Sequence, residues 1–391
     1  MKQYLIIGNG VAGTTAAENI RKLDRDGAIT ILTDEPLPFY WRTKLNDFIS
    51  GETDEAALIA KKESWYEENA VDLRLNTRVT GADAGRRRVL TGDDNEFSYD
   101  VLLLATGSHS FVPPIKGSDK QGVFALRSIR DAREILGWAE AREEAVLIGG
   151  GLLGLETGKA LRKLGKKVTV VEFFPRLLPR QLDENGAKRL QGIMEEMGFS
   201  FRLGARTEEI TGETRVNGVR LEGGETLSAE MVIISAGVRP NLDLAAPLGL
   251  MTDKGVKVDE RLQTNVPGVF AAGDVAEFKG IPYGIWPAAL EQGKIAGINM
   301  AGGEARYEGT TMANTLKVVG IDLASAGDID AEDKRESRIV QDDRIYRKIV
   351  LDKGRIIGCI MLGNTTGFHR VTRMMAEKRD VSRMVDQILE P

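Results

Sequence analysis

The chain has 391 residues, of which 42% are hydrophobic and 28% are charged, as in ordinary soluble globular proteins. This length exceeds what one compact domain usually holds, so two or three domains are predicted. The net charge of −5 disfavours a role that depends on binding nucleic acid or an anionic membrane surface. No apolar run approaches the ~20 residues of a membrane span, and the N-terminus shows no signal-peptide pattern. A cytoplasmic location is therefore expected.

The chain contains a single cysteine, Cys359, which excludes an intramolecular disulfide and a zinc site built from cysteines alone. It falls on a predicted strand over residues 356–362. A free cysteine in such a position is commonly a small buried hydrophobe, so a structural role is expected for it. No metal site is predicted in the sequence.

The chain opens with a pattern typical of a dinucleotide-binding unit. An apolar strand at residues 4–7 leads into glycines at G-x-G-x-x-G spacing, and a helix is expected to open over residues 14–20. The glycines permit a tight turn, a close approach of the backbone to a pyrophosphate, and close packing of the helix on the strand. A second strand at residues 28–32 is followed by Asp34 and Glu35, where an acidic side chain can bind a ribose hydroxyl.

The same pattern returns in the middle of the chain. A strand at residues 146–148 leads into glycines at the same spacing and a helix over residues 155–164, and a strand at residues 168–171 ends at Glu172. A hairpin and then an apolar strand follow each copy in the same order. They occupy residues 89–99 and 101–107 after the first copy, and 218–227 and 231–237 after the second. A whole domain is thus repeated, and the sequence predicts that one chain holds two dinucleotides.

The glycine loops and the neighbouring strand ends supply the candidate contacts to the two dinucleotides. For the first they are Gly8, Gly10, Val11, Ala12, Gly13, Asp34, Glu35, Val79, Ala105, Thr106 and Gly107. For the second they are Gly149, Gly151, Leu152, Leu153, Gly154, Glu172 and Gly237.

A third motif, residues 264–274, adds a resemblance to a known family. With the two glycine phrases, it makes the chain similar to the two-dinucleotide flavoprotein reductases of the pyridine nucleotide–disulfide oxidoreductase superfamily. The resemblance is strong over residues 1–303 and looser beyond. It implies FAD at the first site and NAD(P)H at the second, with Gly273 and Asp274 at the flavin and Asp274 on its ribityl chain.

The fold implied is α/β, with two Rossmann-like dinucleotide-binding domains in the three-layer ββα arrangement of glutathione reductase and a small α+β C-terminal domain. The expected domains are an FAD-binding domain over residues 1–115 and 238–306, an NAD-binding domain over residues 116–237, and a C-terminal domain over residues 307–391.

The absence of cysteines near the first site narrows the subfamily. Disulfide reductases need a cysteine pair beside the flavin, and other members use one cysteine shortly after the first acidic residue, but residues 35–51 contain none. The Tyr-x-Arg-x-x-Leu segment within residues 38–47 is similar to that of rubredoxin reductases, and also to oxygenase-type ferredoxin reductases and the flavin part of assimilatory nitrite reductase. This resemblance implies a flavin contact for Arg42.

Two further segments carry the resemblance to the flavin site. Residues 124–132 match a family segment whose arginine touches FAD, which implies this role for Arg127. Residues 284–300 match a segment that lies along the isoalloxazine ring, with Trp286 as its aromatic. Core packing is the alternative for Trp286. A helix starting near Pro287 could aim N–H groups at the pyrimidine end of the flavin.

Lys44 and Glu156 are the candidate catalytic residues. Ferredoxin reductases of this type carry a Leu-Ser-Lys loop whose lysine pairs with the glutamate of the second glycine motif near flavin N5. Here Lys44 precedes Leu45, as a basic residue does in rubredoxin reductases, so a Lys44–Glu156 pair is expected beside the nicotinamide. A solvated surface lysine is the alternative for Lys44.

The coenzyme is expected to be NADH rather than NADPH. Glu172 would accept hydrogen bonds from a ribose 2′-hydroxyl and repel a 2′-phosphate. Arg176, four residues further on, keeps NADPH open as the less favoured alternative.

The tail differs in pattern from the rest of the chain. Strands are predicted at residues 315–319, 346–351 and 355–362, with a hairpin turn at 352–354, and one helix is predicted over residues 368–389. That helix carries six basic residues: His369, Arg370, Arg373, Lys378, Arg379 and Arg383. They could dock an acidic carrier protein or form an ordinary solvated face.

The leading interpretation is an FAD-dependent NADH oxidoreductase that reduces a small carrier such as rubredoxin or ferredoxin, as a monomer or homodimer. Two alternatives stay open: an NADH oxidase that reduces oxygen to peroxide, and a redox-dependent interaction or signalling flavoprotein.

Overall fold

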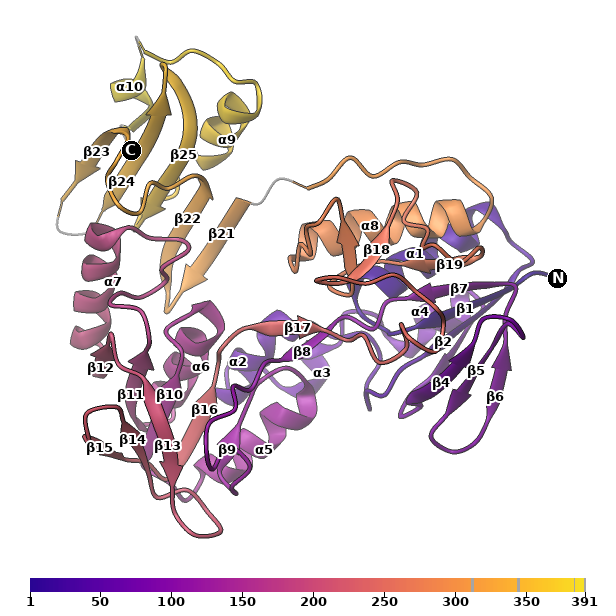
Figure 1. The fold of residues 1–391 in the computed structure, drawn as a ribbon, viewed down its shortest axis with the longest axis horizontal. Coiled ribbons are helices and arrows are strands. Elements are labelled where there is room, and N and C mark those ends of the chain that lie inside the picture. Colours follow the sequence, from indigo (N-terminus) through magenta and orange to yellow (C-terminus); the bar gives the residue numbers. More distant parts are fainter. Residues whose placement is uncertain (311–312, 343–344, 383, 390–391) are drawn as a thin grey trace.

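The computed structural model describes residues 1–310, 313–342, 345–382 and 384–389. Figure 1 shows three parts, each built on a sheet. No helix among the described residues is both long and apolar enough to cross a membrane.

The first part contains a five-stranded parallel sheet. Its strands, in spatial order, are β19 (Val269–Ala271), β7 (Val101–Leu104), β1 (Gln3–Ile7), β2 (Ala28–Leu32) and β3 (Val71–Arg74). β1 and β7 are apolar and buried almost throughout, as expected of strands covered on both faces. This confirms the predicted strands at residues 4–7 and 28–32, whereas the strand predicted at residues 101–107 ends at Leu104.

Helices α1 (Val11–Leu23) and α8 (Trp286–Met300) cross closely beside this sheet. A Cβ atom at Gly293 would come within 2.4 Å of the Ala12 carbonyl oxygen, and one at Gly297 would come equally close to that of Ala16. Small residues at these positions let the two helices touch, which fixes the first glycine loop against α8.

The first part of the chain contains further short elements outside that sheet. They are the 3₁₀ turn Arg42–Lys44, α2 (Leu45–Ile49), α3 (Glu55–Leu58), α4 (Glu63–Glu68), β18 (Val256–Val258), β20 (Ala276–Phe278), and the antiparallel β4 (Val79–Asp83), β5 (Arg88–Thr91) and β6 (Glu96–Ser98). β5 and β6 confirm the first predicted hairpin.

The second part repeats the first. Its parallel sheet has the order β12 (Phe199–Leu203), β11 (Lys167–Glu172), β10 (Glu144–Ile148), β16 (Met231–Ile234) and β9 (Val123–Phe124). The other elements are α5 (Ile129–Ala139), α6 (Leu152–Lys163), α7 (Glu184–Glu196), β13 (Thr207–Thr211), β14 (Gly218–Leu221) and β15 (Thr226–Ser228). α1 and α6 both begin three residues before the predicted positions, directly after the second glycine of each motif.

The chain crosses between the two parts twice, and the two crossings run side by side. β8 (Ser108–Ser110) and β17 (Val238–Pro240) form an antiparallel pair. β8 leads from the end of β7 into the second part, and β17 leads from the end of β16 back to the first part's later elements (Figure 1).

The C-terminal part is an antiparallel sheet with two short helices. The strand order is β21 (Ala313–Val318), β22 (Ile321–Gly327), β25 (Arg355–Leu362), β24 (Tyr346–Asp352) and β23 (Glu336–Gln341). Cys359 lies on β25 and is fully buried, as predicted.

The single helix predicted over residues 368–389 is wrong. The structure has α9 (Phe368–Ala376) and α10 (Val385–Leu389), because the chain turns at Lys378, whose φ is +50°. The Val381 amide then donates to the Gly354 carbonyl at 2.8 Å, which ties this turn to the β24–β25 hairpin. Lys378 and Arg379 therefore lie outside both helices, and Arg383 lies outside the described residues.

The C-terminal sheet sits on the second part, above α7 (Figure 1). Lys348 on β24 donates to the Asp183 carboxylate at 3.0 Å, and Tyr346 donates to the same oxygen at 2.5 Å. Both Lys348 and Asp183 are completely buried. A buried ion pair thus joins the C-terminal sheet to the N-terminus of α7.

Candidate dinucleotide-binding sites

The first glycine loop has a geometry that only glycine permits at two of its three positions. Gly8 has φ +112°, and a Cβ atom there would lie 2.1 Å from the Ala105 carbonyl oxygen. A Cβ atom at Gly13 would lie 2.0 Å from the Gly8 carbonyl oxygen. Beside Gly10 there is open space. The loop is therefore tight against the protein and open at Gly10, where the amides at the start of α1 can meet a phosphate.

The second glycine loop has the same geometry. Gly149 has φ +114°, and its Cβ atom would lie 2.2 Å from the Ser235 carbonyl oxygen. The Gly154 Cβ atom would lie 2.5 Å from the Gly149 carbonyl oxygen, and the space beside Gly151 is again open. Two cradles of the same shape thus stand at the carboxyl ends of two parallel sheets, where α/β proteins bind dinucleotides.

The acidic residues after the two glycine loops do not occupy equivalent positions. Ile7 pairs with Leu32 in the first sheet, and Ile148 pairs with Val171 in the second. Thr33 is therefore the register equivalent of Glu172. Asp34 and Glu35 correspond to the two residues after Glu172, which are Phe173 and Phe174. The sequence alone does not show which residue of the first copy is equivalent to Glu172.

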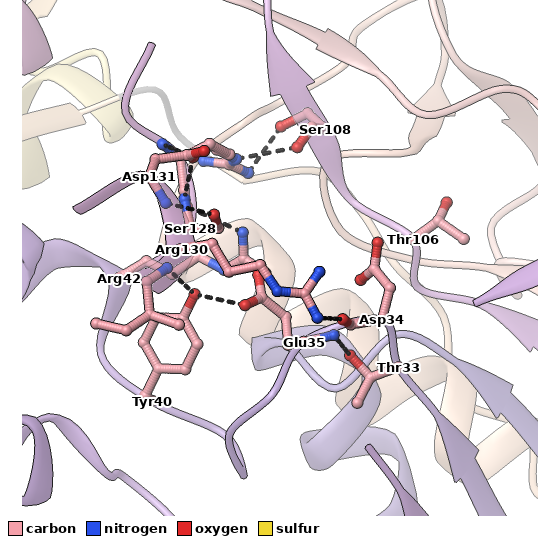
Figure 2. Close-up of polar contacts among 12 residues, drawn as sticks. Thr33, Asp34, Glu35, Tyr40, Arg42, Thr106, Ser108, Ser128, Arg130 and Asp131 are labelled. Atoms are coloured by element: carbon pink, nitrogen blue, oxygen red, sulfur yellow. Dashed lines mark hydrogen bonds and ion pairs between the residues drawn. The ribbon is translucent and has the colours of Figure 1, made fainter. Parts of the chain in front are cut away.

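Glu35 is held by its own protein neighbours. Its carboxylate accepts from Arg42 at 2.9 Å and from the Tyr40 hydroxyl at 3.0 Å (Figure 2). Burial raises the pKa of Glu35, and the charge of Arg42 opposes that rise. Asp34 is exposed, and Arg130 donates to its carbonyl at 2.8 Å. Asp34 is thus the acid of this pair whose carboxylate stands toward solvent.

Glu172, at the end of β11, is buried, and its carboxylate links the second glycine loop to the residues that follow β11. One carboxylate oxygen accepts from the Gly150 amide at 2.5 Å, and the other accepts from the Phe174 amide at 2.8 Å. The carboxylate therefore fixes the shape of the site, and each oxygen keeps capacity for a second donor.

Arg127 and Asp274, which are 147 residues apart in sequence, form an ion pair at 2.8 Å. Ser108 lies between them: its hydroxyl donates to Asp274 and accepts from Arg127, both at 2.7 Å. Burial lowers the pKa of Arg127, and the nearby charge of Asp274 opposes this. Sequence reasoning missed Ser108, although it directly follows the candidate run Ala105–Gly107.

The other predicted contacts of the first site lie on several separate elements. Thr106 and Asn241 exchange hydrogen bonds, with the Asn241 amide donating to the Thr106 carbonyl at 2.7 Å. Gly107 has φ +67° and Gly273 has φ +83°. A Cβ atom at Gly273 would lie 3.1 Å from the Ala12 Cβ atom. Val11 and Ala12 begin α1, and half-buried Val79 begins β4.

A buried, unpartnered donor in the first site fits a bound cofactor. The Asn9 side chain, between Gly8 and Gly10, accepts from the Tyr66 hydroxyl at 2.9 Å through its oxygen. Its nitrogen is buried and has no hydrogen-bond partner within the described structure. Because buried polar groups are nearly always paired, this donor suits an acceptor oxygen of a dinucleotide. The residues present thus fit the dinucleotide that the first glycine phrase implies.

The expected pair of Lys44 and Glu156 is not formed. Lys44 is exposed, and no ion pair joins it to Glu156 in the described structure. Glu156, on α6, instead accepts from the Val319 amide of the C-terminal part at 2.5 Å. Burial raises the pKa of Glu156. The prediction failed because the β21–β22 turn, far along the chain, reaches α6.

Trp286 stacks on residues of the Tyr-x-Arg segment. Its ring lies 5.0 Å from that of Trp41 at an angle of 19°, and 5.9 Å from that of Phe39. Trp286 and Trp41 are both partly exposed. The structure thus joins the start of α8 to the segment that carries Arg42.

The predicted contacts of the second site lie along the start of α6 and the end of β16. Leu152 and Leu153 follow Gly151, and Leu153 is exposed. Gly237 has φ +101° and is exposed beyond β16.

Two open glycine loops on one chain define a protein that binds two dinucleotides, the class of flavin- and pyridine-nucleotide-dependent oxidoreductases. Residues 2–305 match the family model described as "Pyridine nucleotide-disulphide oxidoreductase", and residues 313–379 match the "Rubredoxin NAD+ reductase C-terminal domain". The chain belongs to the pyridine nucleotide-disulphide oxidoreductase family.

Three similar proteins place the chain within that family. It is 38% identical to a nitrite reductase [NAD(P)H] of Bacillus subtilis over 100% of this chain and 49% of that protein, so it spans about half that relative's length. It is 34% identical to a rubredoxin-NAD(+) reductase of Pseudomonas putida over 72% of this chain and 73% of that one. The structure of NADH:rubredoxin oxidoreductase from Clostridium acetobutylicum superposes with a TM-score of 0.85 at 27% identity, covering 99% of both chains.

Cys359 should be inert toward thiol reagents in the folded protein. Burial raises the pKa of its thiol to about 12, so almost no thiolate forms at neutral pH. We expect no reaction with 5,5′-dithiobis(2-nitrobenzoate) in buffer and one thiol per chain in guanidinium chloride. Rapid labelling of the native protein would contradict the buried placement.

Proposed function

We propose that this chain oxidises NADH with bound FAD and passes the electrons to a small one-electron carrier protein. A rubredoxin-like protein is the first candidate for this carrier. One observation carries the proposal: two glycine loops of the same shape occur in a chain whose only cysteine, Cys359, is buried in the C-terminal sheet. With no thiol to relay electrons, the acceptor must be external.

The chain's residues divide into a flavin half and a nicotinamide half. In the flavin half, Arg127, Ser108 and Asp274 form a preorganised polar cluster beside Gly273. In the nicotinamide half, Gly151 leaves room for a pyrophosphate and Glu172 holds the loop that faces the ribose. When bound, FAD supplies an acceptor for a hydride and a donor of single electrons. The protein's contribution is to bind and orient both dinucleotides.

The test is steady-state NADH oxidation against rubredoxins, ferredoxins, oxygen and quinones. We expect fast turnover with a purified carrier protein and slow turnover with air alone. Equally fast turnover with air alone, with peroxide as product, would favour the oxidase alternative. Slow turnover with every acceptor would favour the interaction or signalling flavoprotein.

We expect kcat/KM to favour NADH over NADPH by at least tenfold. The buried Glu172 carboxylate opposes a 2′-phosphate at the ribose. Arg176 donates to the carbonyls of Leu182 and Pro179, both at 3.3 Å, so its guanidinium serves the fold of its own loop. Glu172→Gln removes the charge and keeps one of the two oxygens that accept from the Gly150 and Phe174 amides, and it should narrow the preference. Equal use of NADPH by the wild-type protein would contradict the assignment.

The exposed cations of the C-terminal part are proposed to attract an acidic carrier. Arg370 and Arg373 lie on the exposed face of α9, and Arg379 lies just beyond it; none has an ion pair within the described structure. Changing all three to glutamine should slow carrier reduction through the association rate, and added salt should shrink the difference. Flavin bleaching by NADH in a single turnover should not change. An unchanged carrier rate at low salt would show that the carrier docks elsewhere.

A further inference from the structure

Two large apolar side chains are exposed immediately beyond Glu172. Phe173 is 63% exposed and Phe174 is 49% exposed. Their rings meet edge to face, with centroids 5.5 Å apart and an angle of 84° between the planes. Adjacent exposed aromatic rings forgo the stabilisation that burial would give, so this Phe173–Phe174 pair is suited to binding a flat apolar surface.

The pair is fixed relative to the second glycine loop. The Glu172 carboxylate joins the Gly150 amide to the Phe174 amide, as described above. The Phe174 carbonyl accepts from the Gly204 amide at 2.9 Å, and the Leu178 amide donates back to the Gly150 carbonyl at 3.2 Å. The rings are therefore presented from a backbone anchored on both sides, so they lose little freedom when a ligand binds.

The first copy of the repeat carries charges where the second carries these rings. By register, Asp34 and Glu35 are the equivalents of Phe173 and Phe174. Glu35 forms an ion pair with Arg42 at 2.9 Å. The two sites thus share the glycine cradle and differ in the two residues that follow the register position of Glu172.

We propose that the adenine ring of the pyridine nucleotide stacks on the Phe173–Phe174 pair. The inference rests on the proposed function and deepens it by assigning the adenine contact. With the pyrophosphate at Gly151 and the ribose at the end of β11, the adenine lies beyond Glu172, because the acid-bearing strand ends there. Base–aromatic stacking typically changes affinity by about 5- to 150-fold, which is enough to dominate binding of the adenosine half.

The test measures binding of each half of the nucleotide to oxidised holoprotein by calorimetry. The probes are 5′-ADP for the adenosine half and oxidised nicotinamide mononucleotide for the other. Phe173→Ala and Phe174→Ala are made singly and together; because both side chains are exposed, folding should be little affected. We expect the Kd for ADP to rise about 10-fold in the double variant, while the Kd for the mononucleotide stays unchanged. Phe173→Tyr and Phe174→Tyr, which keep the rings, should bind ADP as the wild type does.

Met251→Ala is the matched control, because Met251 is 62% exposed and lies in the first part of the chain. An ADP affinity within twofold of wild type in the double alanine variant would overturn the inference, as would equal loss of both probes. The proposed function is measured separately, from bleaching of the wild-type flavin by NADH. Wild-type bleaching together with unchanged ADP binding in the double variant would refute only the adenine contact.

Discussion

Replacing Asp274 with alanine should give a protein that purifies with little flavin. Its carboxylate pairs with Arg127 at 2.8 Å and accepts from Ser108 at 2.7 Å, so the change removes both contacts at once. It leaves the partly buried guanidinium of Arg127 without its counter-charge. Losing one hydrogen bond to a charged group costs about 1.5–3 kcal/mol, and the proposed contact to the ribityl chain is lost as well. Together these should weaken FAD binding by 10-fold to more than 100-fold.

The measurement is the ratio of flavin to protein absorbance after purification, followed by titration of the apoprotein with FAD. Asp253→Ala is the control, because Asp253 is an exposed acid of the same part of the chain. Asp274→Asn keeps an oxygen that can accept from Ser108. Its affinity for FAD should lie between those of the alanine variant and the wild type. Full flavin content in Asp274→Ala, with an unchanged Kd, would show that this cluster does not bind the cofactor.

The glycine cradles were predictable because they follow from local backbone requirements. Gly8 and Gly149 both adopt positive φ, and a side chain at either position would collide with a neighbouring carbonyl. A strand, three spaced glycines and a helix therefore predict the turn without knowledge of the rest of the fold. The buried strands were predictable for the same reason, because their apolar runs are continuous.

The register of the acids was not predictable in this way. Asp34, Glu35 and Glu172 all follow a second strand, but only the pairing of strands shows that Thr33 is the equivalent of Glu172. The partners of each acid depend on loops elsewhere, such as Tyr40 and Arg42 for Glu35. Local sequence gives the chemical type of the residue, and tertiary packing decides which direction it faces.

Contacts with the C-terminal part were also missed, because they join distant segments. Glu156 lies 163 residues from its partner Val319, and Asp183 lies 165 residues from Lys348. No periodicity within either segment signals such a contact. The division of the final helix has a similar cause, since Val381 leaves the helix to bond the β24–β25 turn.

Replacing Lys348 with methionine should destabilise the C-terminal part strongly. Lys348 is fully buried and donates to Asp183 at 3.0 Å, to the Asp330 carbonyl at 3.0 Å and to Asp333 at 2.5 Å. Methionine fills a similar volume but leaves the Asp183 carboxylate buried without its cation. Removing one partner of a buried ion pair costs about 3–5 kcal/mol. For a domain of this size, that should lower Tm by more than about 10 °C.

Thermal unfolding by calorimetry, with hydrogen exchange at β24, measures this effect. Lys334→Met is the matched control, because Lys334 is 75% exposed in its ion pair with Glu332, and such pairs contribute about 0–1 kcal/mol. Burial alone would lower the pKa of Lys348, but hydrogen bonds to Asp333 and Asp183 raise it above its ordinary 10.5. A raised pKa means that the pair stabilises the fold fully below pH 10.5 and loses its contribution only as the pH rises through the folded-state pKa. The free energy of unfolding that Lys348→Met loses relative to the wild type should therefore be constant from pH 6 to 9.

A loss no larger than that of Lys334→Met would show that this ion pair does not hold the C-terminal sheet on α7.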